Sequence, residues 1–209
     1  MKNVFMGDSK LNSLSKKIYL QLENPSEDNT LGDRDKVINI LKDKYTNVVM
    51  SYEAMKKLYP MCRDNDFKIT VTMLKREYDW IITNIESGDT TNNHYGLAVD
   101  LGSTTIIMQL VNLNNGEVIA EESIFNKQIK YGEDILTRIF YTKEKKNGLE
   151  EICKSTVESF IDLLNKIKEK THINVYDSSM MIVSGNTTMT HFLLGINPWT
   201  IFQSPFTPV

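Results

Sequence analysis

Cysteine is scarce in this sequence of 209 residues, which contains two, Cys62 and Cys153. They are far apart and form no CxxC pair, so on their own they cannot build a closed zinc or iron–sulfur site. We therefore expect two reduced thiols, as in cytoplasmic proteins, and no iron–sulfur cluster in this chain.

Long apolar runs and an excess of one charge are also absent. No apolar stretch is long enough to span a membrane, and residues 1–17 lack the apolar segment of a signal peptide. The chain has 24 basic and 27 acidic residues, a formal net charge of −3. Such a surface does not attract nucleic acid, so we expect neither a nucleic acid nor a membrane as a partner.

Residues 17–90 have the pattern of a small α+β domain. Asp33 is the expected N-cap of one helix, and residues 52–63 form a second. The sequence predicts strands at residues 17–22, 47–50, 67–74 and 80–85. Residues 1–16 are expected to be a disordered or flexible N-terminus, and the polar residues 87–93 are the best candidate for a domain boundary.

A different pattern follows this boundary, and we expect residues 94–209 to form a second domain. Strands and helices are predicted, in chain order, at residues 95–101, 105–112, 117–125, 132–143, 149–170, 180–183 and 187–194. Residues 117–125 are a predicted strand, and residues 132–143 and 149–170 are predicted helices. The short apolar strand 180–183 is expected to be buried. Three hairpin strands followed by helices and a further strand predict an α/β fold with a mixed sheet.

A polar turn after the first of these strands carries the candidate chemistry. Asp100 lies at the end of the strand and is followed by Gly102, Ser103, Thr104 and Thr105. Glycine lets the backbone approach an anion closely, and backbone N–H groups in such a turn favour negative charge. Because a carboxylate would repel a phosphate, we expect a Mg²⁺ ion between them, bound to Asp100 through water. The turn therefore predicts a phosphate site in which Asp100 is the catalytic and metal-binding residue.

The same residue types also form ordinary Asx and Ser/Thr turns between strands. The context favours the phosphate site, because the turn joins two apolar strands and a second hairpin turn follows at residues 114–116. This arrangement resembles the first phosphate loop of the superfamily of acetate and sugar kinases, Hsp70 and actin. In that superfamily, the loop between the first two strands of an RNase H-like fold binds the phosphates of ATP.

A second candidate segment opens the last predicted helix with Gly185, Asn186 and Thr187. Helix N-termini attract anions through free N–H groups and the helix dipole. Asn186 or Thr187 can instead simply cap the helix, and both interpretations stay open. Asp134 and Arg138 are expected to form an ordinary helix pair at a spacing of four residues, with no catalytic role.

Several ordered segments together carry a closer resemblance. "YGLAVDLGSTT", "NKQIKYGEDILTRI", "VSGNTTMTHFLLGINP" and "SPFTPV" occur in this order. Together they resemble the reductive activators of corrinoid proteins. The earlier segments "KKIYLQLENPSEDNTLGDRDKVINIL" and "FKITVTM" resemble the linker domain of that family. The resemblance thus covers nearly the whole chain from about Lys17 onward.

The resemblance implies an RNase H-like ATPase fold and a role in redox repair. Corrinoid-dependent methyltransferases need Co(I) and are inactivated by oxidation to Co(II). The activators use ATP hydrolysis to drive the electron transfer that restores Co(I). ATP and Mg²⁺ are therefore the implied cofactors, and the corrinoid protein of a methyltransferase system is the implied partner.

The sequence lacks two parts that the resemblance to this family leads us to expect. Residues 1–16 cannot hold the ferredoxin-like domain that carries the family's iron–sulfur cluster, and the sequence stops where the second half of the ATPase domain should begin. We therefore expect a fragment or split part that binds MgATP weakly, and whether it is an enzyme stays open. Its expected partner is the missing half or another copy of the chain in a dimer.

Two other functions remain possible from the sequence. One is a non-catalytic binding or dimerisation module derived from the ATPase. The other is a small-metabolite kinase of the same superfamily, which would need an intact second half.

Overall fold

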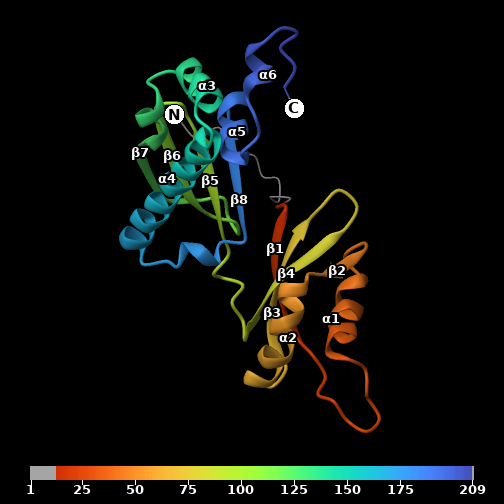
Figure 1. Ribbon diagram of the computed structural model, residues 1–209. Coiled ribbons are helices and arrows are strands. Elements are labelled where there is room, and N and C mark those ends of the chain that lie inside the picture. The colour runs from red at the N-terminus through yellow and green to blue at the C-terminus, as the bar shows by residue number, and fades with distance from the viewer. Residues whose placement is uncertain (1–12, 209) are drawn as a thin grey trace. The chain divides into compact units, whose positions relative to one another are not determined.

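The computed structural model describes residues 13–208, which form two compact units. One unit contains the described residues up to His94 together with Asn112–Gly116. The other contains Tyr95–Val111 and the described residues from Glu117 onward. Figure 1 labels the helices and strands of both units.

The first unit is a mixed four-stranded sheet with two helices. The strand order is β1-β3-β4-β2, in which β3 is antiparallel to β1 and β4, and β2 is parallel to β4. The elements are β1 (Ser15–Gln21), α1 (Asp33–Lys42), β2 (Val48–Met50), α2 (Tyr52–Asp64), β3 (Lys68–Lys75) and β4 (Trp80–Ser87). Its core joins both helices to the sheet through buried apolar residues that include Val37, Leu58, Ile69 and Ile82.

The beginning of this unit differs in two details from the prediction. Residues 1–12 of the segment predicted to be flexible lie outside the described residues, and Ser15 and Lys16 belong to β1. Asp33 is the first residue of α1, and Gly32 occupies the N-cap position in its place.

A buried polar cluster lies within the first unit, at His94. The Oγ atom of Ser15 lies 2.8 Å from Nε2 of His94, and Nδ1 of His94 lies 3.3 Å from Oδ1 of Asn114. The amide nitrogen of Asn114 donates to the carbonyl oxygen of Thr91, which fixes its Oδ1 as the acceptor facing the ring. Nδ1 of the neutral imidazole therefore carries the proton, and Nε2 accepts from the Ser15 hydroxyl. Burial lowers the pKa of His94 because the charged imidazolium is poorly solvated there.

The second unit is also built on a mixed four-stranded sheet, with the order β7-β6-β5-β8. β6 and β7 are antiparallel, whereas β5 and β8 are parallel. The elements are β5 (Tyr95–Leu101), β6 (Thr105–Asn112), β7 (Val118–Phe125), the 3₁₀ helix η1 (Lys127–Tyr131), α3 (Ile135–Glu144), α4 (Gly148–Thr171), the 3₁₀ helix η2 (Val175–Asp177), β8 (Met180–Gly185), α5 (Thr187–Leu194) and α6 (Trp199–Phe202). This mixed α/β architecture confirms the predicted fold class.

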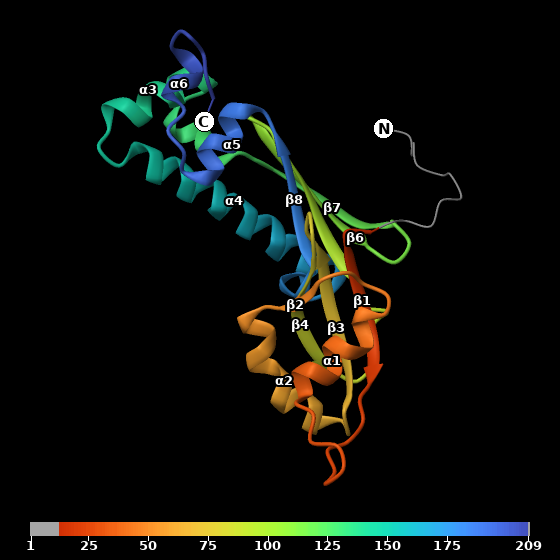
Figure 2. The same ribbon diagram turned by 90° about the vertical axis from the view of Figure 1, so that its right-hand side faces the viewer.

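One face of this second sheet is packed against helices, and Asp100 of β5 is exposed on the other face. Figure 2 shows the helices α3, α4 and α5 on one side of the sheet. Alternate residues of β5 point toward that side, and Leu97, Val99 and Leu101 are buried in the core there. Asp100 lies between two of them and is exposed on the opposite face. The alternation of the strand therefore places the Asp100 carboxylate outside the core.

The predicted helix over residues 132–143 begins too early. Gly132 has a positive φ of 158° and ends η1, so the chain is not helical there. Asp134 is the N-cap of α3, and its side chain accepts a hydrogen bond from the backbone N–H of Thr137. The helix therefore begins at Ile135, because a capping residue lies outside the helix that it caps.

The prediction that strand 180–183 is buried is also wrong. β8 is an edge strand of the described sheet and pairs with β5 alone. Its side chains alternate between the two faces, and Met181 and Ile182 are 40% and 55% exposed. An apolar run does not by itself tell an edge strand from a central one, since burial depends on neighbours that are distant in the sequence.

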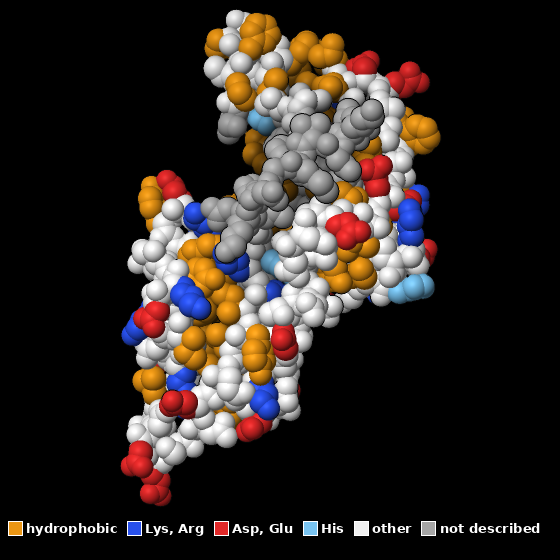
Figure 3. Space-filling view, turned by 180° about the vertical axis from the view of Figure 1, so that it is seen from behind, with side chains coloured by type: hydrophobic (Ala, Val, Ile, Leu, Met, Phe, Trp, Pro, Cys, Tyr) orange, Lys and Arg blue, Asp and Glu red, His pale blue; other side chains and the backbone are white. Residues whose placement is uncertain are grey.

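The surface of the described chain agrees with its balanced composition. On the face visible in Figure 3, acidic and basic side chains are interspersed with apolar ones. Among the described residues, none of the helices has the length and apolar character that crossing a membrane requires.

Candidate functional site

The parallel strands β5 and β8 bring the two predicted site segments together. Asp100 pairs in register with Ser184, and Leu101 pairs with Gly185. The turn after β5 and the start of α5 therefore lie at the same edge of the sheet, at the carboxyl ends of both strands. Gly185 fits closely here, because a Cβ atom at this position would lie 3.1 Å from the carbonyl oxygen of Leu101.

The polar side chains of the turn are available for a ligand. Asp100, Thr104 and Thr105 are exposed, and Ser103 is half-buried. None of these four side chains makes a hydrogen bond or ion pair with a described residue. The turn therefore presents one carboxylate and three hydroxyl groups that have no hydrogen-bond partner among the described residues.

Gly102 is required by the shape of the turn itself. A Cβ atom at this position would overlap the carbonyl oxygen of Thr105. The sequence suggested that this glycine lets an anion approach, whereas the structure gives a local steric reason for it.

Three consecutive carbonyl groups of the turn are bound from behind. The side-chain amide of Asn126 donates to the carbonyl oxygen of Gly102 at 2.9 Å, and the backbone N–H of Asn126 donates to that of Thr104 at 2.8 Å. Between them, Nη1 of Arg138 donates to the carbonyl oxygen of Ser103 at 2.8 Å. The conformation of the turn is thus fixed by residues that follow β7.

These donors belong to a buried polar network that sequence reasoning missed. Arg138 and Gln128 are fully buried, and Asn126 is 1% exposed. Oδ1 of Asn126 accepts from the N–H of Gln128, and Oε1 of Gln128 accepts from Arg138 at 3.2 Å. Nε2 of Gln128 donates to Oγ1 of Thr156 in α4. In the sequence, Asn126, Gln128 and Arg138 were marked only by lying in the segment 126–139, which resembles a known family. That segment has no local chemical pattern that would have identified them.

The predicted ion pair between Asp134 and Arg138 is wrong as a direct contact. Asp134 caps α3, and the hydrogen bonds from Thr137 lower the pKa of its carboxyl group. Arg138 points into the protein, where Nε donates to the carbonyl oxygen of Gly132 at 2.8 Å. Burial lowers the pKa of Arg138, because its charge is removed from water.

The start of α5 is capped as one of the two sequence interpretations proposed. Oδ1 of Asn186 accepts from the backbone N–H of Met189 at 3.0 Å. Thr187 is the first helical residue and is exposed. His191 is buried one turn later, with Nδ1 3.3 Å from the carbonyl oxygen of Asn197, which is a structural contact. A role for Gly185, Asn186 and Thr187 toward a ligand stays a prediction.

The side chains at Asp100 suit a magnesium ion that also has phosphate and water ligands. Among the described residues, no group of three or more His, Cys, Asp or Glu side chains could hold a metal ion. Magnesium often uses one or two carboxylates and takes its other ligands from phosphate oxygens and water. A single exposed carboxylate beside free hydroxyl groups suits a magnesium ion that arrives with a phosphate.

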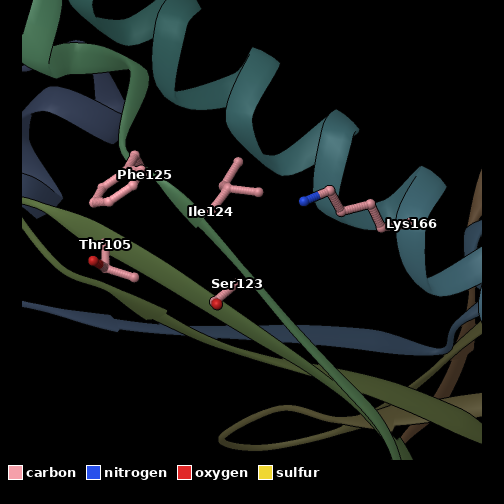
Figure 4. Close-up of a pocket in the computed structure, with 5 residues that line it drawn as sticks. All are labelled: Thr105, Ser123, Ile124, Phe125 and Lys166. Carbon is pink, nitrogen blue, oxygen red and sulfur yellow. The ribbon is translucent and has the colours of Figure 1, made fainter.

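A cavity of about 530 Å³ lies beside one candidate residue, Thr105. Figure 4 shows that its walls come from β6, β7 and α4, with the Lys166 side chain extending from the helix. Its lining residues are Thr105, Ser123, Ile124, Phe125 and Lys166. Asp100 does not line this cavity, whereas Thr105, which directly follows the turn, does.

Two family models match this chain in consecutive segments. The model of the RACo linker region matches residues 7–92, and that of the RACo middle region matches residues 95–209, which is more than half of the chain.

Individual proteins are similar over parts of their length. The corrinoid activation enzyme RamQ of Eubacterium limosum is 31% identical over 126 residues, which are 60% of this chain and 21% of that protein. The solved structure of a reductive activator for corrinoid, iron–sulfur protein is 29% identical and superimposes with a TM-score of 0.84, covering 98% of this chain and 33% of the other. The chain thus spans between a fifth and a third of these relatives. It belongs to the family of reductive activators of corrinoid proteins, of which it contains the linker and middle regions.

Proposed function

We propose that this chain supplies the phosphate-binding part of an ATP-dependent reductive activator that restores Co(I) in a corrinoid protein. Two relatives with this kind of role support the proposal, one by sequence and one by a structure that superimposes on nearly the whole chain. Because the chain spans a minor part of both, the complete reaction is assigned to an assembly that includes further protein.

The chemistry divides between the nucleotide and the chain. Hydrolysis of ATP supplies the free energy for moving one electron from a low-potential iron–sulfur donor to Co(II), which becomes Co(I). Within this chain, Asp100 would hold a magnesium ion through water, and Ser103, Thr104 and Thr105 would donate hydrogen bonds to phosphate oxygens. Gly185, Asn186 and Thr187 bring the N-terminus of α5 to the same edge. Hydrogen bonds to charged groups contribute roughly 1.5–3 kcal/mol each, so a few of them suffice to hold a phosphate tail.

The observation that carries the proposal is the state of the Asp100 side chain. It is exposed at the carboxyl end of β5 and has no partner among the described residues. It lies two residues before the turn whose carbonyl groups are hydrogen-bonded by Asn126 and Arg138. A carboxylate in an ordinary Asx turn would accept a hydrogen bond from the following backbone, and Asp100 accepts none.

Calorimetry with Asp100→Asn tests the proposal. Loss of the negative charge should weaken binding of magnesium tripolyphosphate by about 10-fold to 100-fold, the equivalent of one charged hydrogen bond. The unfolding free energy should stay within about 0.5 kcal/mol of wild type, because the side chain is exposed. Asp177→Asn removes an exposed carboxylate elsewhere in the same unit and should bind like wild type. Equal affinity of Asp100→Asn and wild type would contradict the proposal.

A second candidate function is a binding or dimerisation module, and the edge strand β8 favours it. An edge strand offers unpaired backbone groups, and Met181 and Ile182 add exposed apolar surface. If copies of the chain associate here, Ile182→Lys should shift sedimentation toward the monomer. Ile119→Lys places the same change on the opposite edge strand, β7, and should leave association unchanged. A concentration-independent monomer in the wild type would exclude the dimerisation form of this function.

A further inference from the structure

The peptide groups of the turn after β5 are oriented so that two of their N–H groups point away from the buried polar network. The carbonyl oxygens of Gly102 and Ser103 point toward Asn126 and Arg138, which bind them. In a trans peptide the following N–H points the opposite way, so the N–H groups of Ser103 and Thr104 point away from the buried network. Neither of these two N–H groups donates to a described residue. Two adjacent donors are therefore directed away from the core, beside the exposed Thr104 side chain.

Arg138 places a positive charge directly behind these donors. Its described hydrogen-bond partners are neutral: the carbonyl oxygens of Ser103, Gly132 and Glu133, Oε1 of Gln128 and the sulfur of Met189. No ion pair within 4 Å joins it to a carboxylate in the part of the chain that the structure describes, and Asp134 acts on it from a greater distance. A buried charge without a close countercharge is unfavourable. An anion bound in the turn would lessen this cost, because the guanidinium contacts the turn through Ser103.

We propose that Asn126 and Arg138 are positioning residues of the phosphate site. They hold the turn from behind so that the N–H groups of Ser103 and Thr104 face the ligand, and Arg138 supplies positive charge that a bound triphosphate neutralises. Gln128 links the two by accepting from Arg138 and donating its N–H to Asn126. This inference rests on the proposed function, since it assigns the residues that support the turn of the same site without contacting the ligand.

The shape of the turn is tested first without any ligand, by amide NMR of the complete chain. Asn126→Asp keeps the oxygen that accepts from Gln128 but places an oxygen opposite the Gly102 carbonyl, which removes that hydrogen bond. The amide signals of Ser103 and Thr104 should shift or broaden in this variant, with the rest of the spectrum preserved. Asn165→Asp makes the same chemical change on the exposed face of α4 and keeps the oxygen that accepts from Tyr176, so it should leave these two signals unchanged.

Binding is then measured by titrating inorganic tripolyphosphate in the presence of MgCl₂. Asn126→Asp should weaken binding at least tenfold, whereas Asn165→Asp should bind like wild type. Arg138→Lys keeps the charge but cannot reach Ser103, Gly132 and Gln128 together, and Arg138→Met loses both the charge and the hydrogen bonds. The affinities should therefore fall in the order wild type, Arg138→Lys, Arg138→Met, and the salt dependence of binding should be weakest for Arg138→Met.

The outcomes separate this inference from the proposed function. If Arg138→Met does not fold, Asn126→Asp and Arg138→Lys still decide the result, because both keep a polar group at the site. Unchanged Ser103 and Thr104 signals in Asn126→Asp, or wild-type affinity in Asn126→Asp and Arg138→Lys, would overturn the inference alone. Failure of the wild-type chain to bind tripolyphosphate would overturn the proposed function, and the ligand-binding role of these residues with it.

Discussion

Single atoms decide the shape of the turn between β5 and β6. At Gly102, even one methyl group would overlap the carbonyl oxygen of Thr105, and that group belongs to the backbone and cannot rotate away. The carbonyl of Gly102 is itself held by Asn126, so the chain has little freedom to adjust. The turn is therefore strongly constrained, although its side chains are exposed.

We expect Gly102→Ala to destabilise the chain by about 1–3 kcal/mol, the usual cost of inserting a group into a filled space. Urea unfolding followed by circular dichroism measures this change. Ser103→Ala is the control, because the Ser103 hydroxyl makes no hydrogen bond to a described residue, and it should change stability by less than about 0.5 kcal/mol. A stability of Gly102→Ala equal to that of Ser103→Ala would show that the turn relaxes freely.

His94 predicts a dependence of stability on pH. Its pKa in the folded chain is lowered by burial, whereas an unfolded histidine titrates near about 6.5. As the pH falls below this value, the unfolded chain takes up the proton first, so the free energy of unfolding decreases. The neighbouring charges act in opposite directions, since Lys17 lowers the pKa of His94 and Glu86 raises it.

We expect His94→Gln to lose part of this dependence, because glutamine does not titrate. Urea unfolding at several pH values between 5 and 8 measures it for both proteins. The difference between them should change with pH below about 6.5 and become constant above about pH 7.5. A wild-type chain that grows more stable toward pH 5 relative to His94→Gln would contradict the assignment of a neutral, buried imidazole.

Sequence reasoning could propose Asp100 and the residues of the following turn as a candidate site because they follow one another in the chain. Asp100 to Thr105 form one strand end and one turn, and their chemistry can be read locally. Asn126 and Arg138 were not found, because they contact the turn across 24 and 35 residues. Such contacts depend on how α3 and η1 pack against the sheet, which a pattern of residue types does not contain.

Strands and helices differ in how well their limits follow from local pattern. The strands Tyr95–Leu101 and Thr105–Asn112 and the helix Thr187–Leu194 have the limits that alternation and helical spacing predict. The start of α3 was predicted too early because Gly132 ends the 3₁₀ helix η1 and Asp134 is the N-cap of α3. The burial of β8 was misjudged because an edge strand and a central strand can share one apolar pattern.

Helix α5 allows its two interpretations to be separated at Asn186. We expect Asn186→Ala to cost about 1 kcal/mol in unfolding free energy, because the hydrogen bond to the N–H of Met189 is lost. Asn186→Asp keeps this acceptor and favours the helix dipole, so it should be as stable as wild type. If the start of α5 also faces the phosphate, Asn186→Asp should weaken tripolyphosphate binding despite its normal stability. Normal binding by Asn186→Asp would assign the residue to capping alone.

The proposed phosphate site at the turn after β5 has a cavity of the described residues on one side. This cavity of about 530 Å³ is lined by Thr105 but not by Asp100, Ser103 or Thr104, and a second cavity of about 200 Å³ is lined by none of these four residues. The smaller cavity includes Leu97 and Met180, at the ends of β5 and β8 that are opposite to Asp100. Asp100, Thr104 and Thr105 are exposed, so most of the polar side chains of the turn lie on the surface of the described chain.

We expect the chain to bind magnesium ATP and magnesium tripolyphosphate with affinities within about threefold of each other, a difference below about 0.7 kcal/mol. The reason is that a base left in water gains little, whereas an enclosed base would contribute about 25 cal/mol for each Å² of apolar surface buried. Calorimetry of both ligands under the same conditions measures the difference, with adenosine alone as the control that should give no binding heat. If magnesium ATP bound at least tenfold more tightly than tripolyphosphate, the chain would itself contain a base pocket, and the division of the nucleotide site between this chain and further protein would be wrong.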